Sequence, residues 1–496
     1  MKEVVSFENM KKSDEYTCNN LIPSRELMYR AALGIYKNVS WHGKIAIVCG
    51  SGNNAADGYA LASILNKNGY DVSIILLFDK LSNDGKYYFD ICKEQGVSYL
   101  SYREGALNNY DIIVDCIFGI GFKGQIDGIA KACIEEINST RAYIVCADIN
   151  SGLLANSGIC DLCVISDLTV SIGSYKSGHI LGMAKDKIKS LVNCDIGIKL
   201  LDKPFMLIEQ SDVKEALPKR EHFSHKGTYG YVTLIGGSYE YSGALKLANL
   251  SASAVRSGAG VVRLATPKSI GYAVMPYILE STLYPLSEAD GAIKFDENEI
   301  QGAINSTKSV GIGMGMGQRG DNEEVITYLL KNYSGTLVID ADGLNTLSKM
   351  ELSLLNDAKC KVVLTPHLKE FERLSGIPVD EILHDPIYYA KDFAKKYGVI
   401  LLLKGTSTII TDGEDVRITN TGCQGMASGG SGDVLLGIIS ALCAQMQGRE
   451  LEAVWASAYI NGRAGEIASR QLCDISMSAG DTAMCVALSI KEIVES

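Results

Sequence analysis

One repeated pattern limits the fold of this chain more than any other feature: a short apolar run, a glycine-rich turn, then a helical segment. In the first half a helical segment at 58–68 separates the first two apolar runs, which makes a βαβ crossover. The runs are nearly continuous, as is typical of strands covered on both faces. They fall at residues 44–49, 72–77, 111–115, 143–146 and 168–172. The pattern predicts an α/β fold with a parallel, doubly wound sheet.

The pattern lapses between residues 196 and 218 and then resumes. At 496 residues the chain is long enough for two domains with full cores. The halves do not look like copies of each other, so we expect two α/β domains, at 1–205 and 221–496, joined by a linker at 206–220. In the second half we expect strands at 231–235, 261–265, 337–340, 362–365 and 400–403, and helices at 241–257, 434–446 and 450–469.

Charge and composition exclude several classes of protein. The net charge of −11 argues against a nucleic-acid or anionic-membrane partner. No apolar run approaches membrane-spanning length, and the first residues contain acids where a signal peptide has its apolar segment. We therefore expect a cytoplasmic protein. The 14 cysteines are scattered, and the single Cys-x-x-Cys, at 160–163, is weak evidence for zinc, so we expect reduced and mostly buried thiols.

The most informative short motif is Gly-Gly-Ser-Gly-Asp at 429–433, which runs directly into an apolar helical segment. Glycines before a helix leave backbone N–H groups unshielded, and with the helix dipole they favour an anion such as phosphate. A carboxylate beside a phosphate site can take a proton from an attacking hydroxyl. An ordinary helix cap is the alternative for Asp433, but the cluster of small residues favours catalysis.

Three polar clusters follow strands of the first half, at 50–58, 115–124 and 148–152. Each alone is compatible with simple turns, because Asn, Asp, Gly and Ser favour turns for local reasons. Strand ends in one parallel sheet meet at one edge, however, which is where α/β folds bind ligands. Their oxygen atoms suit a hard cation or a sugar-phosphate better than a transition metal.

Asn-Asn-Ala-Ala-Asp-Gly at 53–58, Asp-Cys-Ile-Phe-Gly-Ile-Gly at 115–121 and Asp-Ile-Asn-Ser-Gly at 148–152 resemble the motifs of the NAD(P)H-hydrate epimerase domain. The resemblance spans most of residues 1–205 and implies a Rossmann-like domain. That family usually has Gly-Gly where Ala55 and Ala56 stand, and Pro where Asn150 stands.

The resemblance implies roles for individual residues of the first half. It implies that Asn54, Asp115 and Ser151 hold K⁺, and that Asp148 contacts the hydrated nicotinamide nucleotide and is a candidate acid–base group. The substrate-binding residues that it implies are Asn53, Asn54, Asp57, Gly119, Gly121 and Gly124.

The second half resembles the NAD(P)H-hydrate dehydratase domain, which has a ribokinase-like fold. The resemblance covers roughly 220–496 and rests on Gly-Ile-Gly-Met-Gly-Met-Gly at 311–317, Asp-Ala-Asp at 340–342, Thr-Pro-His at 365–367, Lys-Gly-Thr at 404–406 and the motif at 429–433.

By this resemblance Ala244, Gly315, His367 and Asp433 face the hydrated nucleotide. ADP or ATP, with Mg²⁺ bridging its phosphates, is expected at Lys404, Gly405, Thr406, Ser407, Thr408 and Gly432. His367 has an alternative role, capping the helix that begins at Leu368; its place at a strand end favours ligand binding.

The two resemblances together imply repair of hydrated NADH and NADPH. The first domain would interconvert the R and S epimers. In the second, Asp433 would take the proton of the hydrate hydroxyl as that oxygen attacks the terminal phosphoryl group, and phosphate would then leave. We expect a homo-oligomer. The alternative is a small-molecule kinase of the ribokinase-like superfamily with a non-catalytic, nucleotide-binding first domain.

Overall fold

The computed structural model describes residues 1–252 and 256–496, which divide into two compact units. One unit comprises residues 3–205. The other comprises residues 1–2 and 206–496. Among the described residues, no helix is both long and apolar enough to span a membrane.

The sheet of residues 3–205 is parallel throughout, with strand order β4-β3-β2-β5-β6-β7-β9. This order confirms the predicted doubly wound sheet of a Rossmann-like domain. β1 and β8, which pair in parallel, are not part of this sheet. The strands are β1 (Lys2–Val5), β2 (Lys44–Cys49), β3 (Asp71–Leu76), β4 (Ser98–Ser101), β5 (Ile112–Cys116), β6 (Tyr143–Ala147), β7 (Leu168–Ile172), β8 (Tyr175–Lys176) and β9 (Leu191–Cys194).

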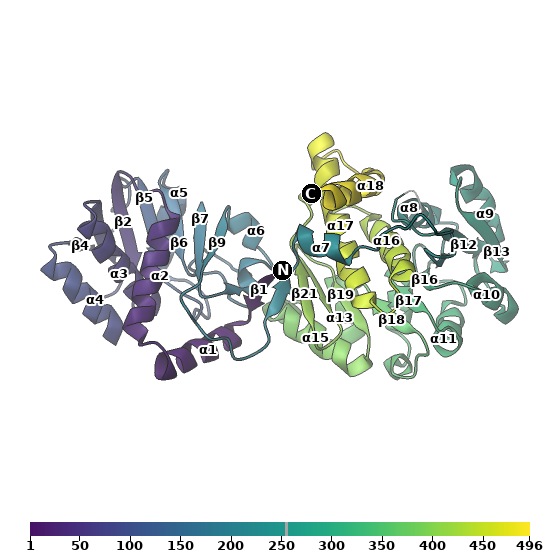
Figure 1. The fold of residues 1–496 in the computed structure, drawn as a ribbon, viewed down its shortest axis with the longest axis horizontal. Helices are drawn as coiled ribbons and strands as arrows, with labels where there is room; N and C mark the ends of the chain where they lie inside the picture. Colours follow the sequence, from purple (N-terminus) through teal and green to yellow (C-terminus); the bar gives the residue numbers. More distant parts are fainter. Residues whose placement is uncertain (253–255) are drawn as a thin grey trace. The chain divides into compact units, whose positions relative to one another are not determined.

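Helices cover both faces of this sheet, which explains its continuous apolar runs. Buried side chains of α2, α3 and α4 pack on one face, and those of α5 pack on the other (Figure 1). The helices are α1 (Phe7–Asn20), α2 (Ser24–Asn38), α3 (Asn53–Lys67), α4 (Asn83–Glu94), α5 (Gly128–Ser139) and α6 (Ala184–Lys187).

The sheet of the second unit runs in the order β13-β12-β11-β16-β17-β18-β19-β20-β21-β10. It is parallel from β13 to β19, and β20 then pairs antiparallel with both its neighbours. The strands are β10 (Phe205–Leu207), β11 (Tyr231–Ile235), β12 (Val261–Pro267), β13 (Thr282–Leu286), β16 (Ser309–Ile312), β17 (Thr336–Ile339), β18 (Lys361–Leu364), β19 (Ile400–Leu403), β20 (Thr408–Thr411) and β21 (Val416–Thr419), with a small hairpin of β14 (Glu288–Ala289) and β15 (Ala292–Ile293).

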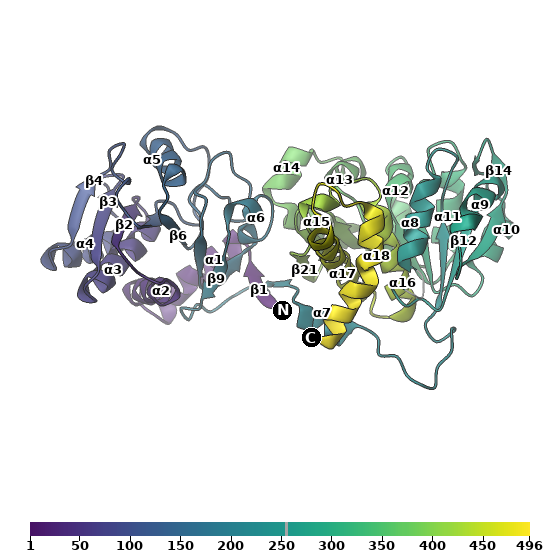
Figure 2. The ribbon, with the colours of Figure 1, turned by 90° about the horizontal axis from the view of Figure 1, so that it is seen from above.

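The largest apolar core of this unit lies between its sheet and the helices α8, α16, α17 and α18 (Figure 2). The helices are α7 (Gln210–Ala216), α8 (Ser242–Ala252), α9 (Lys268–Val274), α10 (Glu297–Ile304), α11 (Asn322–Asn332), α12 (Ala341–Leu347), α13 (Leu368–Ser375), α14 (Val379–His384), α15 (Pro386–Tyr397), α16 (Ser431–Gln445), α17 (Glu450–Gln471) and α18 (Ala479–Glu495).

The predicted strands at 168–172, 231–235 and 400–403 are confirmed residue for residue. The helix predicted to begin at residue 58 begins at Asn53 instead, because Gly52 is its extended cap and two alanines favour the first turn. The helix expected at 241–257 is described over Ser242–Ala252, and residues 253–255 lie outside the described residues.

Residues 206–220, expected as a linker, contain most of β10 and all of α7. The predicted domain limits themselves remain a prediction.

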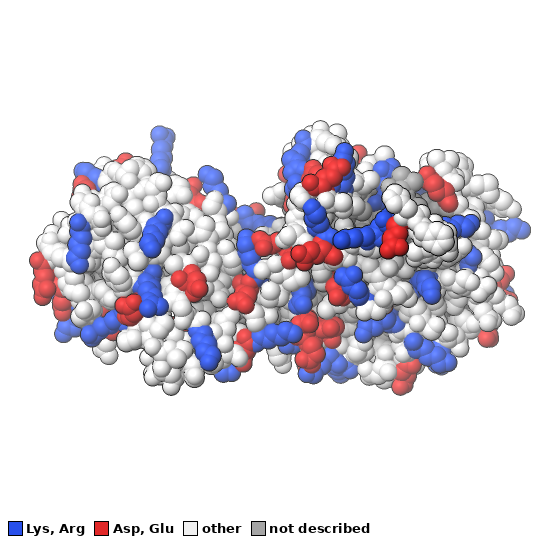
Figure 3. Space-filling model, viewed as in Figure 1, with Lys and Arg blue, Asp and Glu red and all other residues white. Residues whose placement is uncertain are grey.

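On the face in Figure 3, Lys and Arg side chains are interspersed with Asp and Glu side chains.

Candidate active sites

The first candidate site lies where the strand order of residues 3–205 reverses, between β2 and β5. From this point crossovers lead outward in both directions, so the loops after β2 and β5 diverge and leave a crevice. Asn54 is in the first turn of α3, after β2, and Asp115 is the penultimate residue of β5. Ser151 follows the adjacent strand β6 and bonds to Asp115 and to Phe118 in the loop after β5. The topology thus brings together the three polar clusters seen in the sequence.

A buried oxygen cluster joins Asn54, Asp115 and Ser151. Ser151 donates from its hydroxyl to the Asp115 carboxylate at 2.6 Å and from its backbone N–H at 2.8 Å. Asn54 donates from Nδ2 to the carbonyl of Phe118 at 2.9 Å. The Asn54 Oδ1 atom is buried and has no hydrogen-bond partner. Burial raises the pKa of Asp115, although the Ser151 hydrogen bonds act in the opposite direction.

Asp148 has strained backbone, with a φ of 66°. Its carboxylate forms an ion pair with Lys176, whose side chain is only 1% exposed. His179 lies 2.8 Å from the Asp148 carbonyl through Nε2, while its Nδ1 accepts from the Lys176 backbone N–H. Burial lowers the pKa of His179 to about 3, so the ring is neutral and Nε2 is the donor. These contacts fix the position of Asp148.

A cavity of about 740 Å³ opens beside these groups. Burial raises the pKa of Asp57 well above its ordinary value, and the neighbouring Asp148 adds to this effect. The lining includes five predicted substrate-binding residues and excludes Gly124, which follows on the same loop as Gly121. The polar lining residues and glycines that matter here are Asp14, Asn53, Asn54, Asp57, Gly119, Gly121, Asp148 and Lys176.

Both departures from the epimerase motifs have a structural explanation. Ala55 and Ala56 are 1% and 0% exposed, belong to the apolar core under α3, and are not among the lining residues. Asn150 is fully buried, donates to the Val164 carbonyl and accepts from the Thr169 hydroxyl. Neither change places a new side chain in the cavity.

The second candidate site lies at the carboxyl ends of neighbouring strands in the other unit. Asp340 follows β17, His367 follows β18 and Lys404 follows β19. The backbones of His367 and Lys404 form an isolated parallel bridge, and the Lys404 N–H donates to the Pro366 carbonyl at 2.8 Å.

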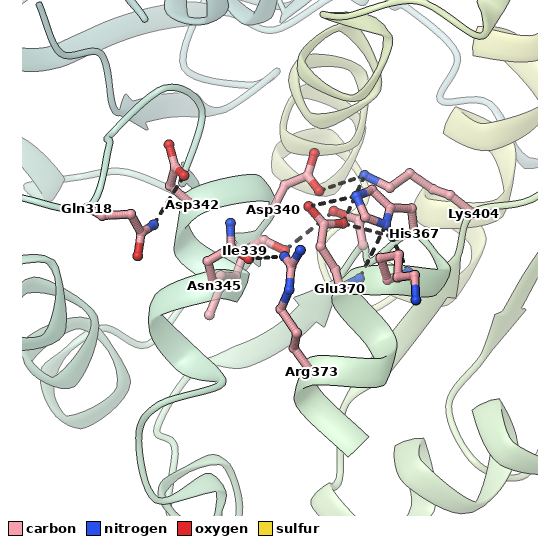
Figure 4. Close-up of polar contacts among 11 residues, drawn as sticks. Gln318, Ile339, Asp340, Asp342, Asn345, His367, Glu370, Arg373 and Lys404 are labelled. Carbon is pink, nitrogen blue, oxygen red and sulfur yellow. Dashed lines mark hydrogen bonds and ion pairs between the residues drawn. The ribbon is translucent and has the colours of Figure 1, made fainter. Parts of the chain in front are cut away.

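A buried charge network links these strand ends, as Figure 4 shows. The Lys404 ammonium group lies 2.8 Å from Asp340 and 3.9 Å from Glu370. Asp340 is 2% exposed and Glu370 is 7% exposed. Burial acts to lower the pKa of Lys404, but the two carboxylates outweigh it and the pKa is raised. Lys404 therefore stays charged.

His367 caps the helix α13. Its Nδ1 accepts from the N–H groups of Lys369 and Glu370, and the Glu370 carboxylate accepts from the His367 N–H, which completes a capping box. The capping role weighed at the sequence level is thus observed. The ring is half exposed, and ligand binding through its other side remains a prediction.

Asp433 lies in the first turn of α16, whose cap Gly430 has a φ of 95°. Burial raises the pKa of Asp433 to about 7, and the nearby Asp340 adds to the effect. Gly432 lies directly against the charge network, because a Cβ atom there would be 3.2 Å from Asp340 Oδ2 and 3.3 Å from Lys404 Nζ. The structure therefore brings the glycine motif and Lys404 to one place.

Ala244 and Gly315 also lie together. A Cβ atom on Gly315, whose φ is 59°, would lie 3.1 Å from the Ala244 Cβ and 2.3 Å from the Tyr241 carbonyl oxygen. The predicted nucleotide-binding residues at 404–408 connect β19 to β20, and Ser407 donates to Asn420.

Sequence reasoning gave no role to Asp14, Lys176, Asp340 or Glu370. Asp340 stood within a recognised motif, so its position was visible. Glu370 had a weaker signal, its place three residues after a helix cap. Asp14, on α1, had no signal at all.

Residues 232–483 match the family described as NAD(P)H-hydrate dehydratase, and residues 24–178 match the family described as YjeF-related protein N-terminus. A bifunctional NAD(P)H-hydrate repair enzyme of Moorella thermoacetica is 34% identical over 496 residues, covering 95% of this chain and 92% of the relative. This chain belongs to the bifunctional NAD(P)H-hydrate repair enzyme family. Another such repair enzyme, from Archaeoglobus fulgidus, is 32% identical and covers 89% of each chain.

Solved structures agree with this family for the second unit. An ADP/ATP-dependent NAD(P)H-hydrate dehydratase of Bacillus subtilis, co-crystallised with ATP and Mg²⁺, is 27% identical, with a TM-score of 0.51 over 58% of this chain and 99% of that one. A ribokinase-like superfamily protein of Enterococcus faecalis, 22% identical with a TM-score of 0.51, covers 60% of this chain and 99% of its own and confirms the fold.

Proposed function

We propose that this repair-enzyme chain restores NADH and NADPH from their hydrates with two activities. Residues 3–205 interconvert the R and S epimers, and residues 206–496 dehydrate the S hydrate with ADP or ATP. The observation on which the dehydratase assignment rests is the position of Asp433, at the opening of α16 and beside Gly432 and Lys404.

Asp433 is the proton acceptor for the hydrate hydroxyl. No described residue donates a hydrogen bond to its carboxylate, so the carboxylate is free to accept the proton. As the hydroxyl oxygen forms its bond to the terminal phosphorus, the bond from that phosphorus to the nucleotide breaks. The hydroxyl oxygen then leaves the ring as part of phosphate, a far better leaving group than hydroxide. The adjacent ring carbon loses a proton as the ring double bond forms, and the dihydronicotinamide of NADH or NADPH is restored.

Gly432 and Lys404 stabilise the charge on the transferring phosphoryl group. Helix N–H groups at the start of α16 favour an anion, and the Lys404 ammonium group lies beside Gly432 in that first turn. Mg²⁺, when bound, neutralises phosphate charge. It takes only one or two carboxylates in addition to phosphate oxygens and water, and the Asp340 carboxylate next to Gly432 fits that requirement.

K⁺ fits the oxygen cluster of the other unit. Asn54 Oδ1 is a buried acceptor without a partner, and Asp115 is an adjacent buried carboxylate. A hard cation would satisfy the first and balance the charge of the second. Asn54, Asp115 and Ser151 would hold it, and Asp148, fixed by Lys176, would exchange a proton with the hydrate.

The test supplies purified protein with hydrated NADH, or with hydrated NADPH, and either ADP or ATP with Mg²⁺. We expect NADH absorbance to return and free phosphate to accumulate. In the absence of nucleotide, epimer exchange should continue. The exchange is measured by chromatographic separation of the two epimers, in buffer with K⁺ or with Na⁺. No return of absorbance with either nucleotide would refute the dehydratase assignment.

The kinase alternative predicts a different product. A small-molecule kinase releases a stable phosphorylated compound, whereas the dehydratase releases phosphate and NADH. Phosphorus NMR of the reaction mixture separates the two. A persistent phosphate ester as the end product would favour the kinase.

A further inference from the structure

Cys160 and Cys163 lie side by side in the loop that connects β6 to β7. Their Sγ atoms are 3.4 Å apart, and all 14 cysteines of the chain are free thiols. Cys163 is buried and Cys160 is partly exposed. The described residues contain no group of three or more Cys, His, Asp or Glu side chains that could hold a metal. The pair is therefore a dithiol within reach of solvent.

The dithiol belongs to a small apolar cluster that borders the substrate cavity. Cys163 packs in this cluster with Ile149 and Leu153. Ile149 lies between Asp148 and Ser151 in the sequence, and Leu153 follows Ser151 by two residues. Cys160 packs against the same cluster. Its other members are Ala155, Ala184, Phe7, Ile120 and Ile188, of which Phe7 and Ile120 line the cavity.

Backbone contacts connect the dithiol loop to the site more directly. The Val164 N–H donates to the Ser151 carbonyl at 3.0 Å, and the Asn150 side chain donates to the Val164 carbonyl at 2.8 Å. A Cβ atom on Gly152 would lie 2.2 Å from the Leu162 carbonyl oxygen, so the two loops are in close contact. Movement of residues 160–163 will shift residues 148–152.

We propose that Cys160 and Cys163 are a redox-responsive pair, oxidised to a disulfide by a low-molecular-weight disulfide, and that this oxidation lowers epimerase turnover. The regulatory part rests on the epimerase function proposed above. The modification itself does not depend on that function, so the two can fail separately.

The exchange is balanced. The Cys160 thiolate attacks one sulfur of the small disulfide, whose S–S bond breaks, and one small thiol leaves with the electron pair and takes up a proton. Cys163 then loses its proton and attacks Cys160 Sγ, which expels the second small thiol. In net terms the protein dithiol loses two electrons and two protons, and the small disulfide gains them.

The environment suits Cys160 to the first step. The hydrogen bond with Cys163 lowers the pKa of Cys160 to about 7, with the positive charge of Lys187 as a smaller cause. The same bond raises the pKa of Cys163. A partly exposed thiol with a pKa near ambient pH reacts fastest with disulfides. Cys160 attacks first and Cys163 resolves.

Disulfide formation shortens the Sγ–Sγ distance from 3.4 Å to about 2.05 Å. The shift of more than 1 Å occurs inside a packed cluster, where neighbours must move with it. The contacts with residues 148–152 transmit this shift toward Asp148, and a displacement of about 1 Å at a reacting group can reduce a rate by up to about a hundredfold. We therefore expect at least about a tenfold loss of epimer exchange.

The experiment uses the full-length protein, equilibrated with oxidised glutathione and then with dithiothreitol. Mass spectrometry after alkylation shows whether a disulfide joins Cys160 to Cys163. Epimer exchange and dehydratase activity are measured on the same samples, together with amide hydrogen exchange at residues 148–154. Cys160→Ser and Cys163→Ser are the test variants. Cys473→Ser, which removes an exposed thiol of the other unit, is the matched control.

We expect the disulfide in the wild type and in Cys473→Ser, with slower epimer exchange that dithiothreitol restores and with dehydratase activity unchanged. Both test variants should keep their epimerase rate in oxidised glutathione. Absence of the 160–163 disulfide would overturn the proposal. A disulfide that changes neither hydrogen exchange at 148–154 nor epimer exchange would overturn the regulation. If the reduced protein has no epimerase activity, only the proposed function fails, and hydrogen exchange still decides whether the loop responds.

Discussion

Replacing Asp433 with Asn should remove dehydratase activity and at the same time stabilise the unit of residues 206–496. Burial raises the pKa of this carboxyl group from its ordinary value of 3.8 to about 7. A carboxyl group whose pKa is raised on folding destabilises the folded state once it ionises. The cost is absent below the unfolded pKa and reaches its full size above the folded one.

The size of the effect follows from the two pKa values. A difference of one pKa unit corresponds to about 1.36 kcal/mol. Ionisation of Asp433 therefore lowers the free energy of unfolding by about 2 kcal/mol at about pH 5.5 and by about 4 kcal/mol at about pH 8. Asn removes the charge and recovers most of this, since no hydrogen bond to the carboxylate is lost. The gain at the higher pH corresponds to roughly 10 °C in melting temperature. Loss of the base should reduce turnover by about a hundredfold or more.

The assay compares thermal melts and NADH return for wild type and Asp433→Asn at both pH values. Asp342→Asn is the control. Asp342 accepts hydrogen bonds from the Gly317 N–H and the Gln318 amide, so this substitution should lower the stability of the protein. A stability gain of the same size at both pH values would refute the pKa argument. Turnover within about tenfold of wild type would refute the base.

Other predictions test single contacts. Dehydratase kcat/KM should rise from about pH 6 to about pH 8 as Asp433 loses its proton; a flat or falling profile would contradict its role. Gly432→Ala should raise the nucleotide Kd by about tenfold, because the new methyl group approaches Asp340 and Lys404; calorimetry showing unchanged affinity would place the nucleotide elsewhere. Lys404→Met should cost about 3–5 kcal/mol in urea unfolding, since it leaves Asp340 buried and unpaired; a smaller loss would mean that water solvates that carboxylate. Asn54→Ala should remove the response of epimer exchange to K⁺, because its unpartnered Oδ1 is lost; an intact K⁺ response would remove Asn54 from the cation site.

The architecture could be predicted from the sequence because its information is local. Apolar runs with glycine-rich turns indicate buried parallel strands, and β7, β11 and β19 were located to the residue. The start of α3 was placed five residues late, because Asn and Asp indicate turns as well as first helical turns. The antiparallel β20 and β21 were missed, since polar ends shorten their apolar runs.

The site was predictable only where its residues fall in motifs. Asn54, Asp115 and Ser151 were named together from motifs. The structure shows Ser151 bonded to Asp115, and Asn54 and Ser151 both donating to the Phe118 carbonyl. Glu370 lies under Lys404 because β18 and β19 are neighbours, a pairing that no local pattern contains. Asp14 lines the cavity from α1. No local sequence pattern shows that α1 lies beside the loops that follow β2 and β5.

The carboxylates of Asp148, Asp340 and Asp433 differ in their chemistry because they have different partners. Asp148 has Lys176 and Asp340 has Lys404, so each of these charges is balanced inside the protein. Asp433 receives no hydrogen bond from any described residue and ends at a pKa of about 7, where a proton is accepted and returned with little cost. Lysine placed beside Asp340 rather than beside Asp433 does two things. It holds the Lys404 ammonium group beside Gly432, where it can donate to a phosphoryl group, and it leaves Asp433 basic enough to take a hydroxyl proton. Moving that lysine to pair with Asp433 would remove both properties, so the position of Lys404 is as important to dehydration as Asp433 itself.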